Sequence, residues 1–305
     1  GWDSSSDFLK REVARSRHSI LLKLAGYGDA DMINIFKNNK FIEPIAATKP
    51  APGNLLTLQA KKLKCTHAMH FSSFHKYVRE DSLWANKYTT PETDLKRGWD
   101  KKIGYFKQFS SILITEDGFK KIPTIYPTKN DLPIHPPEKY GDKWDEELTD
   151  FDEKFVVKYL NKIAQVNKNS FSIKVGSRLV SPDQGYYRAN SPFIFHVPRK
   201  SLLRAIKSNI FDDLLIGNFA KVYILENQPV NFKNTFKVAS KYIDNAGVNN
   251  LEELKKFLWV YRNSYDNKLI QIKSDIKVKS RDLILSKLIS NKKILGVLKN
   301  IYQRF

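Results

Sequence analysis

The chain has 305 residues, 41% of them hydrophobic, and its 52 Lys and Arg against 32 Asp and Glu give a net charge of +20 at pH 7. This apolar content is enough for a core and excludes a disordered basic tail. The single cysteine, Cys65, excludes an intrachain disulfide and hence a secreted scaffold built on disulfides. Since no run of about 18 apolar residues occurs, a transmembrane helix is excluded too.

The N-terminal part is predicted to be mainly helical. Apolar residues from Phe8 to Leu24 follow a helical pattern that stops at Gly26, and residues 29–35 fit a second, short helix. Residues 43–54, rich in Pro and Ala, are predicted to form a linker or an extended arm.

Two further signals lie before the middle of the chain. Thr90-Pro91-Glu92 marks a helix start, with Pro at the first helical position and acids in the first turn. Residues 111–126 fit a hairpin that turns at Glu116-Asp117-Gly118. The four prolines of residues 127–142 cannot join a helix, so this segment is the predicted boundary. We therefore expect a mainly helical region 1–126 with a hairpin near its end, a Pro-rich linker 127–142 and an α+β region 143–305 ending in a basic helix.

The region after the boundary begins with seven carboxylates within residues 142–153, which lead into a helix whose apolar face runs from Phe155 to Ile163. Next we expect a strand pair in which residues 171–180 form one arm and residues 186–197 return. Pro198 leads into another helix, and three more elements follow. They are a short strand at 222–225, a helix capped by Asn250, and an amphipathic basic segment at 280–305. The predicted fold class is α+β, with mixed helices, short antiparallel hairpins, extended Pro-rich arms and a basic C-terminal helix.

The charge excess predicts a polyanionic partner: RNA, DNA or an anionic membrane surface. Of the 52 basic residues 40 are Lys, which suits phosphate contact better than base readout, although an AT-rich coding bias also raises Lys. Three surfaces are predicted to bind RNA. They are the first helix, the hairpin region 171–200, where tyrosines could stack on bases or simply cover the core, and the last helix, whose lysines could instead be a solvated face. The predicted RNA-binding residues are Lys10, Arg11, Arg15, Arg17, Lys23, Lys174, Arg178, Tyr186, Tyr187, Arg188, Arg199, Lys200, Lys287, Lys292, Lys293 and Lys299.

The acidic block has two interpretations besides a solvated helix start. It could face a basic protein neighbour, with Asp145, Glu146, Glu147 and Asp150 as the contact residues. Alternatively, its carboxylates could hold the metal ions of a nuclease, although such sites draw ligands from separate elements. We expect the contact with a protein neighbour.

Four potential zinc ligands lie close together: Cys65, His67, His70 and His75. Their spacing matches no structural zinc site. Ordinary packing of Cys65 and His67, with His70 and His75 on a basic rim, is the alternative, and we expect no metal and no cofactor. No nucleophile elbow, phosphate-binding glycine loop or zinc-protease motif occurs, so an enzyme is not expected.

At class level the chain resembles nucleus-encoded fungal mitochondrial ribosomal proteins. The resemblance rests on the non-Met start at Gly1, Lys-dominated basicity, Pro-punctuated arms at 43–54 and 127–137, and the basic last helix. It implies a structural RNA-binding component of the mitochondrial ribosome, with the small subunit as a guess, located in the mitochondrial matrix and contacting ribosomal RNA and other ribosomal proteins. No stable homo-oligomer is expected. The alternatives are a nucleic-acid-processing enzyme that uses the His cluster or the acidic block, and a peripheral membrane protein.

Overall fold

The computed structural model describes residues 2–24, 34–44, 50–71, 75–124, 132–166, 171–183, 185, 193–225 and 238–263. The chain divides into two compact units, one made of Gly1–Glu12 with Lys256–Phe305 and the other of Val13–Lys255. Helices α1 (Trp2–Arg15) and α8 (Leu251–Asn263) each continue from one unit into the other. The Pro-rich segment 127–142, our predicted boundary, lies inside the second unit.

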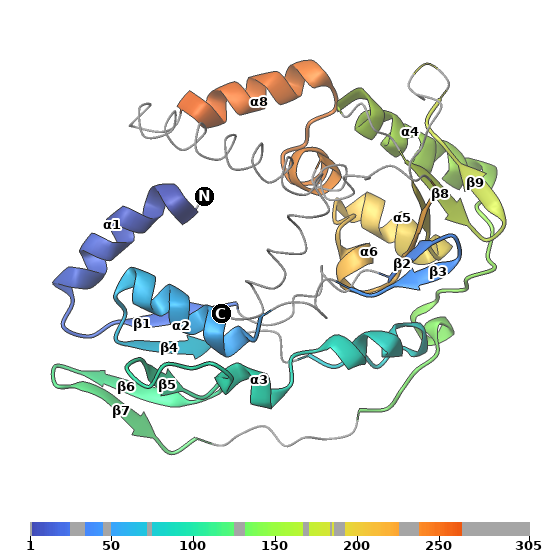
Figure 1. The fold of residues 1–305 in the computed structure, drawn as a ribbon. Coiled ribbons are helices and arrows are strands. Elements are labelled where there is room, and N and C mark those ends of the chain that lie inside the picture. The colour runs from blue at the N-terminus through green and yellow to red at the C-terminus, as the bar shows by residue number, and fades with distance from the viewer. Residues whose placement is uncertain are drawn as a thin grey trace, which may run out of the picture. The chain divides into compact units, whose positions relative to one another are not determined.

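A small parallel sheet holds the N-terminal part of the second unit. Its order is β1 (Ile20–Lys23), β4 (His67–His70) and β5 (Gly104–Phe106), each parallel to its neighbour. Helix α2 (Pro52–Leu63) directly precedes β4 in the chain and packs beside it (Figure 1). Its apolar side, including Leu56, Ala60 and Leu63, is buried.

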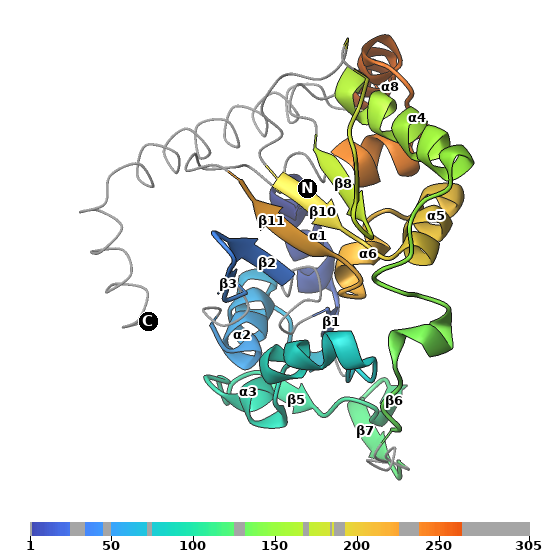
Figure 2. The same ribbon diagram turned by 90° about the vertical axis from the view of Figure 1, so that its right-hand side faces the viewer.

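The remaining strands form a larger mixed sheet. Its order is β3-β2-β11-β10-β8-β9, and the central strands lie side by side in Figure 2. The strands are β2 (Asn34–Lys37), β3 (Lys40–Ile42), β8 (Ser172–Val175), β9 (Arg178–Val180), β10 (Phe193–His196) and β11 (Lys221–Ile224). The pairs β8–β10 and β2–β11 are parallel, and the others are antiparallel.

The main core lies between one face of this sheet and three helices. These are α4 (Asp150–Val166), α5 (Arg199–Ser208) and α6 (Asp213–Ile216). A fully buried aromatic cluster of Phe171, Phe193, Phe195 and Phe211 fills its centre. Because β-strand side chains alternate, these core contacts also fix which residues point to the other face of the sheet.

Short elements complete the second unit. The 3-10 helices are η3 (Glu80–Tyr88) and η4 (Pro137–Tyr140), and η5 (Val238–Asp244) is a π-helical segment. Helix α3 (Glu92–Lys96) starts where Thr90-Pro91-Glu92 predicted it, with Pro91 as the N-cap residue rather than the first helical one. The predicted hairpin is β6 (Ser111–Thr115) paired with β7 (Gly118–Ile122).

Three predictions about the N-terminal part were wrong. The first helix ends at Arg15, and Ile20–Lys23 is a strand, because its apolar run pairs with β4. The helix predicted over 29–35 is wrong at Ile35, which lies in β2 and packs on the main core. The predicted 43–54 linker is too long, since α2 already begins at Pro52, where proline suits the first helical turn.

The predicted strand pair after the boundary was also drawn incorrectly. Residues 172–180 are not one arm but a tight hairpin of β8 and β9, which turns at Gly176 with φ of 57°. The returning strand β10 runs parallel to β8, not antiparallel.

The predicted helices α4 and α5, the strand β11 and the helix α8 are present. Asn250 caps α8, since its Oδ1 accepts a hydrogen bond from the Glu253 amide at 2.9 Å. The C-terminal segment 280–305 lies outside the described residues. Helices together with short antiparallel strand pairs confirm the α+β class.

Replacing Gly53 with alanine should destabilise the protein by about 1–3 kcal/mol, because the added methyl would collide with the backbone carbonyl oxygen of Leu95 where α2 packs on α3. At an open helix position the same change stabilises a protein by about 1 kcal/mol. The sign of the change in the free energy of unfolding therefore distinguishes a crowded position from an open one. Urea unfolding of Gly53→Ala beside the exposed control Lys62→Ala measures it. A Gly53→Ala protein more stable than wild type would contradict the packing described here.

Candidate nucleic-acid interface

The face of the larger sheet that points away from α4 and α5 carries two rows of side chains, which we call the second sheet face. Paired positions in neighbouring strands define each row. The polar row is Leu179, Lys174, His196, Lys221 and Asn34. The aromatic row is Ser172, Ile194, Tyr223, Phe36 and Phe41. The polar row carries the two lysines, and we call it the basic stripe. The aromatic row, which we call the aromatic stripe, has its rings on β11, β2 and β3.

The basic stripe is centred on His196, which Lys174 and Lys221 flank on the two neighbouring strands. Neighbouring strands lie about 4.8 Å apart, so the two lysines start about 10 Å from each other. The Lys221 Nζ lies 4.4 Å from the centroid of the Trp144 ring, and that ring packs edge-on against His196 at 5.0 Å. Two partly buried lysines that both act electrostatically on His196 create a positive potential that suits a phosphate group.

His196 is neutral at physiological pH. Burial, followed by repulsion from Lys174 and Lys221, lowers its pKa to about 4. Its Nε2 is buried and has no hydrogen-bond partner among the described residues. The positive charge of the face therefore comes from the lysines and not from His196.

The lowered pKa of His196 predicts a loss of stability in acid. Above pH 6.5 the imidazole is neutral in the folded and in the unfolded protein. Between pH 6.5 and about 4 only the unfolded chain takes up the proton. The free energy of unfolding therefore falls over this range. With an allowance for partial exposure we expect a loss of about 1–2 kcal/mol. Denaturant unfolding between pH 7 and 4.5 should show this loss in wild type and not in His196→Gln, which shares every carboxylate. Parallel pH profiles for the two proteins would contradict it.

The aromatic stripe is a chain of ring contacts. Phe36 stacks on Tyr223 with centroids 5.3 Å apart and packs edge-on against Phe41 at 5.9 Å. Phe41 in turn meets Trp84 of η3 at 5.3 Å and is 40% exposed. Partly exposed rings beside lysines are the combination on which single-stranded RNA stacks its bases while cations hold its phosphates.

Six of the seven carboxylates of the acidic block have partners inside the second unit. Arg199 binds Glu146 and Asp152, both at 2.7 Å, and Arg178 binds Asp150 at 3.3 Å and Glu153 at 2.7 Å. Hydrogen bonds from the Ser177 amide and hydroxyl lower the pKa of Glu147. Asp152 and Thr149 form a reciprocal capping box at the start of α4.

The sixth carboxylate, Asp142, belongs to a buried network around Arg79. The Arg79 Nη1 lies 2.7 Å from Asp142, and its Nε and Nη2 bind Asp81 at 2.8 and 2.9 Å. Asp142 also accepts hydrogen bonds from the amide and hydroxyl of Ser201, which satisfies the first turn of α5. The Trp144 Nε1 donates to Asp81 at 2.9 Å, so the same network positions the ring that lies against Lys221.

The structure disperses the sequence-predicted RNA-binding residues. Lys174 lies on the second sheet face, whereas Arg178 and Arg199 are engaged by carboxylates and Lys200 is exposed on α5. Lys10, Arg11 and Arg15 lie on α1, but Arg17 follows it and Lys23 is in β1, so one helix does not carry all five. The others lie outside the described residues: Tyr186, Tyr187, Arg188, Lys287, Lys292, Lys293 and Lys299. Of the protein-contact candidates, Asp145 and Glu147 are exposed and form no ion pair with the described residues, although Glu147 accepts hydrogen bonds from Ser177.

The four candidate metal ligands do not converge. His67 and His70 point to opposite faces of β4: the first packs on Phe106 and Phe119, and the second is fully buried with its Nε2 3.2 Å from the Leu95 carbonyl oxygen. Cys65 is buried, and His75 packs edge-on against Tyr77. In the described ranges, no three His, Cys, Asp or Glu side chains form a group that could hold a metal ion.

Sequence reasoning missed most of the second sheet face, namely Phe36, Phe41, His196, Lys221 and Tyr223, and also Trp144, which packs on His196. A usable signal existed in Lys221-Val-Tyr-Ile224, where Lys221 and Tyr223 alternate with the core residue Val222.

In comparisons with protein-family models, curated proteins and solved structures, nothing matches this chain. Of the helices within the described ranges, none combines the length and the apolar character needed to cross a membrane.

Proposed function

We propose that the protein is a structural RNA-binding component of a large ribonucleoprotein. The observation that carries the proposal is how the charges are arranged. Arginines of the second unit bind most of the acidic block, while Lys174 and Lys221 form no ion pair with the described residues. Both lysines lie on the second sheet face, where Lys221 contacts the Trp144 ring and Phe36 stacks on Tyr223.

In this proposal Lys174 and Lys221 contact RNA phosphates, and Tyr223, Phe36 and Phe41 stack on bases. Lysine contacts are sequence-tolerant and strongly dependent on salt. Base stacking on aromatic side chains contributes about 1–3 kcal/mol for each base and also tolerates any sequence. Such a surface suits a protein that holds RNA in place within a particle.

The particle that we propose is the mitochondrial ribosome, on the class-level resemblance of the sequence. Sedimentation of the endogenous protein through a sucrose gradient tests it. We expect co-migration with a ribosomal subunit, lost after RNase treatment. Migration as a free small protein at both low and high salt would overturn the proposal, and flotation with membranes that RNase does not affect would favour a peripheral membrane protein instead.

Binding of the purified chain to RNA tests the biochemical part separately. Fluorescence anisotropy with a labelled single strand should give a dissociation constant that rises steeply between 50 and 200 mM salt, as phosphate contacts require. Affinity that does not depend on salt, or no binding at all, would contradict it. Cleavage of the labelled strand would point to a processing enzyme.

A further inference from the structure

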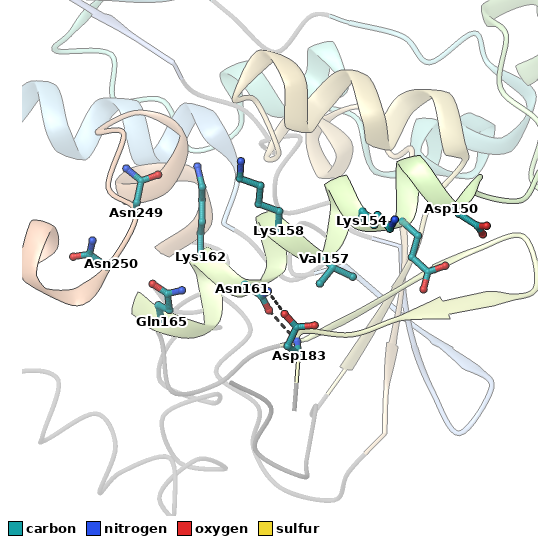
Figure 3. A pocket seen from close by; sticks show the side chains of 11 residues that line it. Asp150, Lys154, Val157, Lys158, Asn161, Lys162, Gln165, Asp183, Asn249 and Asn250 are labelled. Atoms are coloured by element: carbon teal, nitrogen blue, oxygen red, sulfur yellow. Dashed lines mark hydrogen bonds between the residues drawn. The ribbon is translucent and has the colours of Figure 1, made fainter. Parts of the chain in front are cut away.

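A second basic surface lies along the outer side of α4, where residues of the second unit line a groove of about 950 Å³. Lys154, Lys158 and Lys162 contribute its cationic side chains. They recur every four residues, so their Cα atoms are about 6 Å apart along the helix axis. Figure 3 shows Lys158 and Lys162 extending side by side from the same side of α4.

The carboxylates at the groove are already engaged. Asp150 and Glu153 bind Arg178, and Asp183 accepts a hydrogen bond at 2.7 Å from the Asn161 side chain, whose oxygen accepts from the Asp183 amide at 2.9 Å (Figure 3). Lys154 and Lys158 form no ion pair within the part of the chain that the structure describes. Lys162 has acidic neighbours, since its charge contributes to lowering the pKa of Glu253. The groove therefore holds three lysines against three carboxylates, of which Arg178 offsets one, so its balance is weakly positive and its carboxylate oxygens are occupied by partners within the protein.

The groove and the second sheet face lie on opposite sides of the larger sheet. The buried residues of α4, among them Val156, Leu160 and Ile163, face the core between helix and sheet. At 3.6 residues per turn, Lys154, Lys158 and Asn161 project from the opposite side of the helix. The second sheet face points away from the same core on its other side. An RNA strand that is too short to wrap around the second unit therefore cannot occupy the groove and the second sheet face at once.

We propose that the α4 groove binds the phosphodiester backbone of a second RNA segment, so that the second unit bridges two segments, one on each side of the larger sheet. The inference rests on the proposed RNA-binding function and extends it from one RNA site to two. Three evenly spaced lysines match a regular run of phosphates better than a single compact anion. Bridging also gives a physical reason for a structural role, because a protein with two sites holds distant RNA segments together.

The stoichiometry of a short oligonucleotide tests the bridge. The full chain is titrated with a single-stranded RNA of about six nucleotides, and native mass spectrometry and calorimetry count the bound strands. We expect two equivalents for wild type, and one each for Lys154→Gln/Lys158→Gln/Lys162→Gln and for Lys174→Gln/Lys221→Gln. At about 0.7 per phosphate contact, the triple variant should also lower the salt slope of total binding by about 2.

A matched control has the same charge change at exposed positions elsewhere: Lys64→Gln/Lys101→Gln/Lys102→Gln should keep two equivalents. One equivalent in wild type, lost in the sheet-face variant and kept in the α4 variant, overturns the bridge and leaves the proposed function intact. Equal losses in the control and the α4 triple variant overturn the assignment to the groove. No binding by wild type overturns the proposed function itself.

Discussion

Replacing Arg79 with methionine will lower the free energy of unfolding by about 3–5 kcal/mol, the cost of leaving a buried charge without its partner. The side chains of Arg79 and Asp142 are only 7% and 2% exposed, so water cannot take the place of the guanidinium. Arg79 also lies over the Phe219 ring at 4.4 Å, and the variant loses that contact too. Guanidinium chloride unfolding of the purified proteins measures the change.

Two companion variants separate charge from shape. Arg79→Lys keeps the charge but loses the paired hydrogen bonds to Asp81, and we expect an intermediate loss. Arg79→Met/Asp142→Asn removes the two most buried charges of the network, while Asp81 keeps its carboxylate, and should recover part of the stability lost in Arg79→Met. A loss below about 1 kcal/mol in Arg79→Met, the range of an exposed ion pair, would contradict the buried network.

Reversing both lysines of the basic stripe, Lys174→Glu/Lys221→Glu, should weaken RNA binding about 100-fold at 50 mM salt. Each substitution should weaken affinity about tenfold, because it removes a phosphate contact and adds a carboxylate that repels the phosphate. The loss should shrink as salt is added, since screening weakens both terms. Anisotropy titrations at 50 and 200 mM salt measure it.

The matched control for this reversal is Lys64→Glu/Lys101→Glu, which changes the net charge equally at exposed turn positions outside the larger sheet. If both double variants lose the same affinity, binding follows total charge and the second sheet face has no special role. Far-UV circular dichroism and the unfolding midpoint verify that each variant is folded. Tyr223→Ala completes the series, because it removes a ring without changing charge and should act independently of salt.

Local patterns in the sequence predicted the elements whose stability is local. The β6–β7 hairpin carries its own turn, α4 carries its own capping box, and Asn250 caps α8. By contrast, Ile20–Lys23 and Ile35 became strands through partners far along the chain, which local periodicity cannot reveal.

Of the candidate site, the sequence predicted only a residue that can be recognised without knowing which strands are neighbours. Lys174 was found because a basic residue in a strand is visible in sequence, but its neighbours His196 and Lys221 come from separate strands. Arg178 and Arg199 were indistinguishable from RNA-binding residues in sequence, since the acids that hold them are recognised only after folding. Whether the acidic block also contacts a protein neighbour stays a prediction.

The parallel pairing of β2 with β11 has a consequence for how the chain folds. Residues 38–220, most of the second unit, lie between these two strands in the chain, so the larger sheet cannot close until β11 has been synthesised. Until then the β2–β3 hairpin has an unpaired strand edge and exposed rings, which makes it a site for chaperone binding or aggregation. The smaller sheet, whose strands all lie within residues 20–106, has no such delay. The protein should therefore acquire its parallel N-terminal sheet early and its second sheet face late.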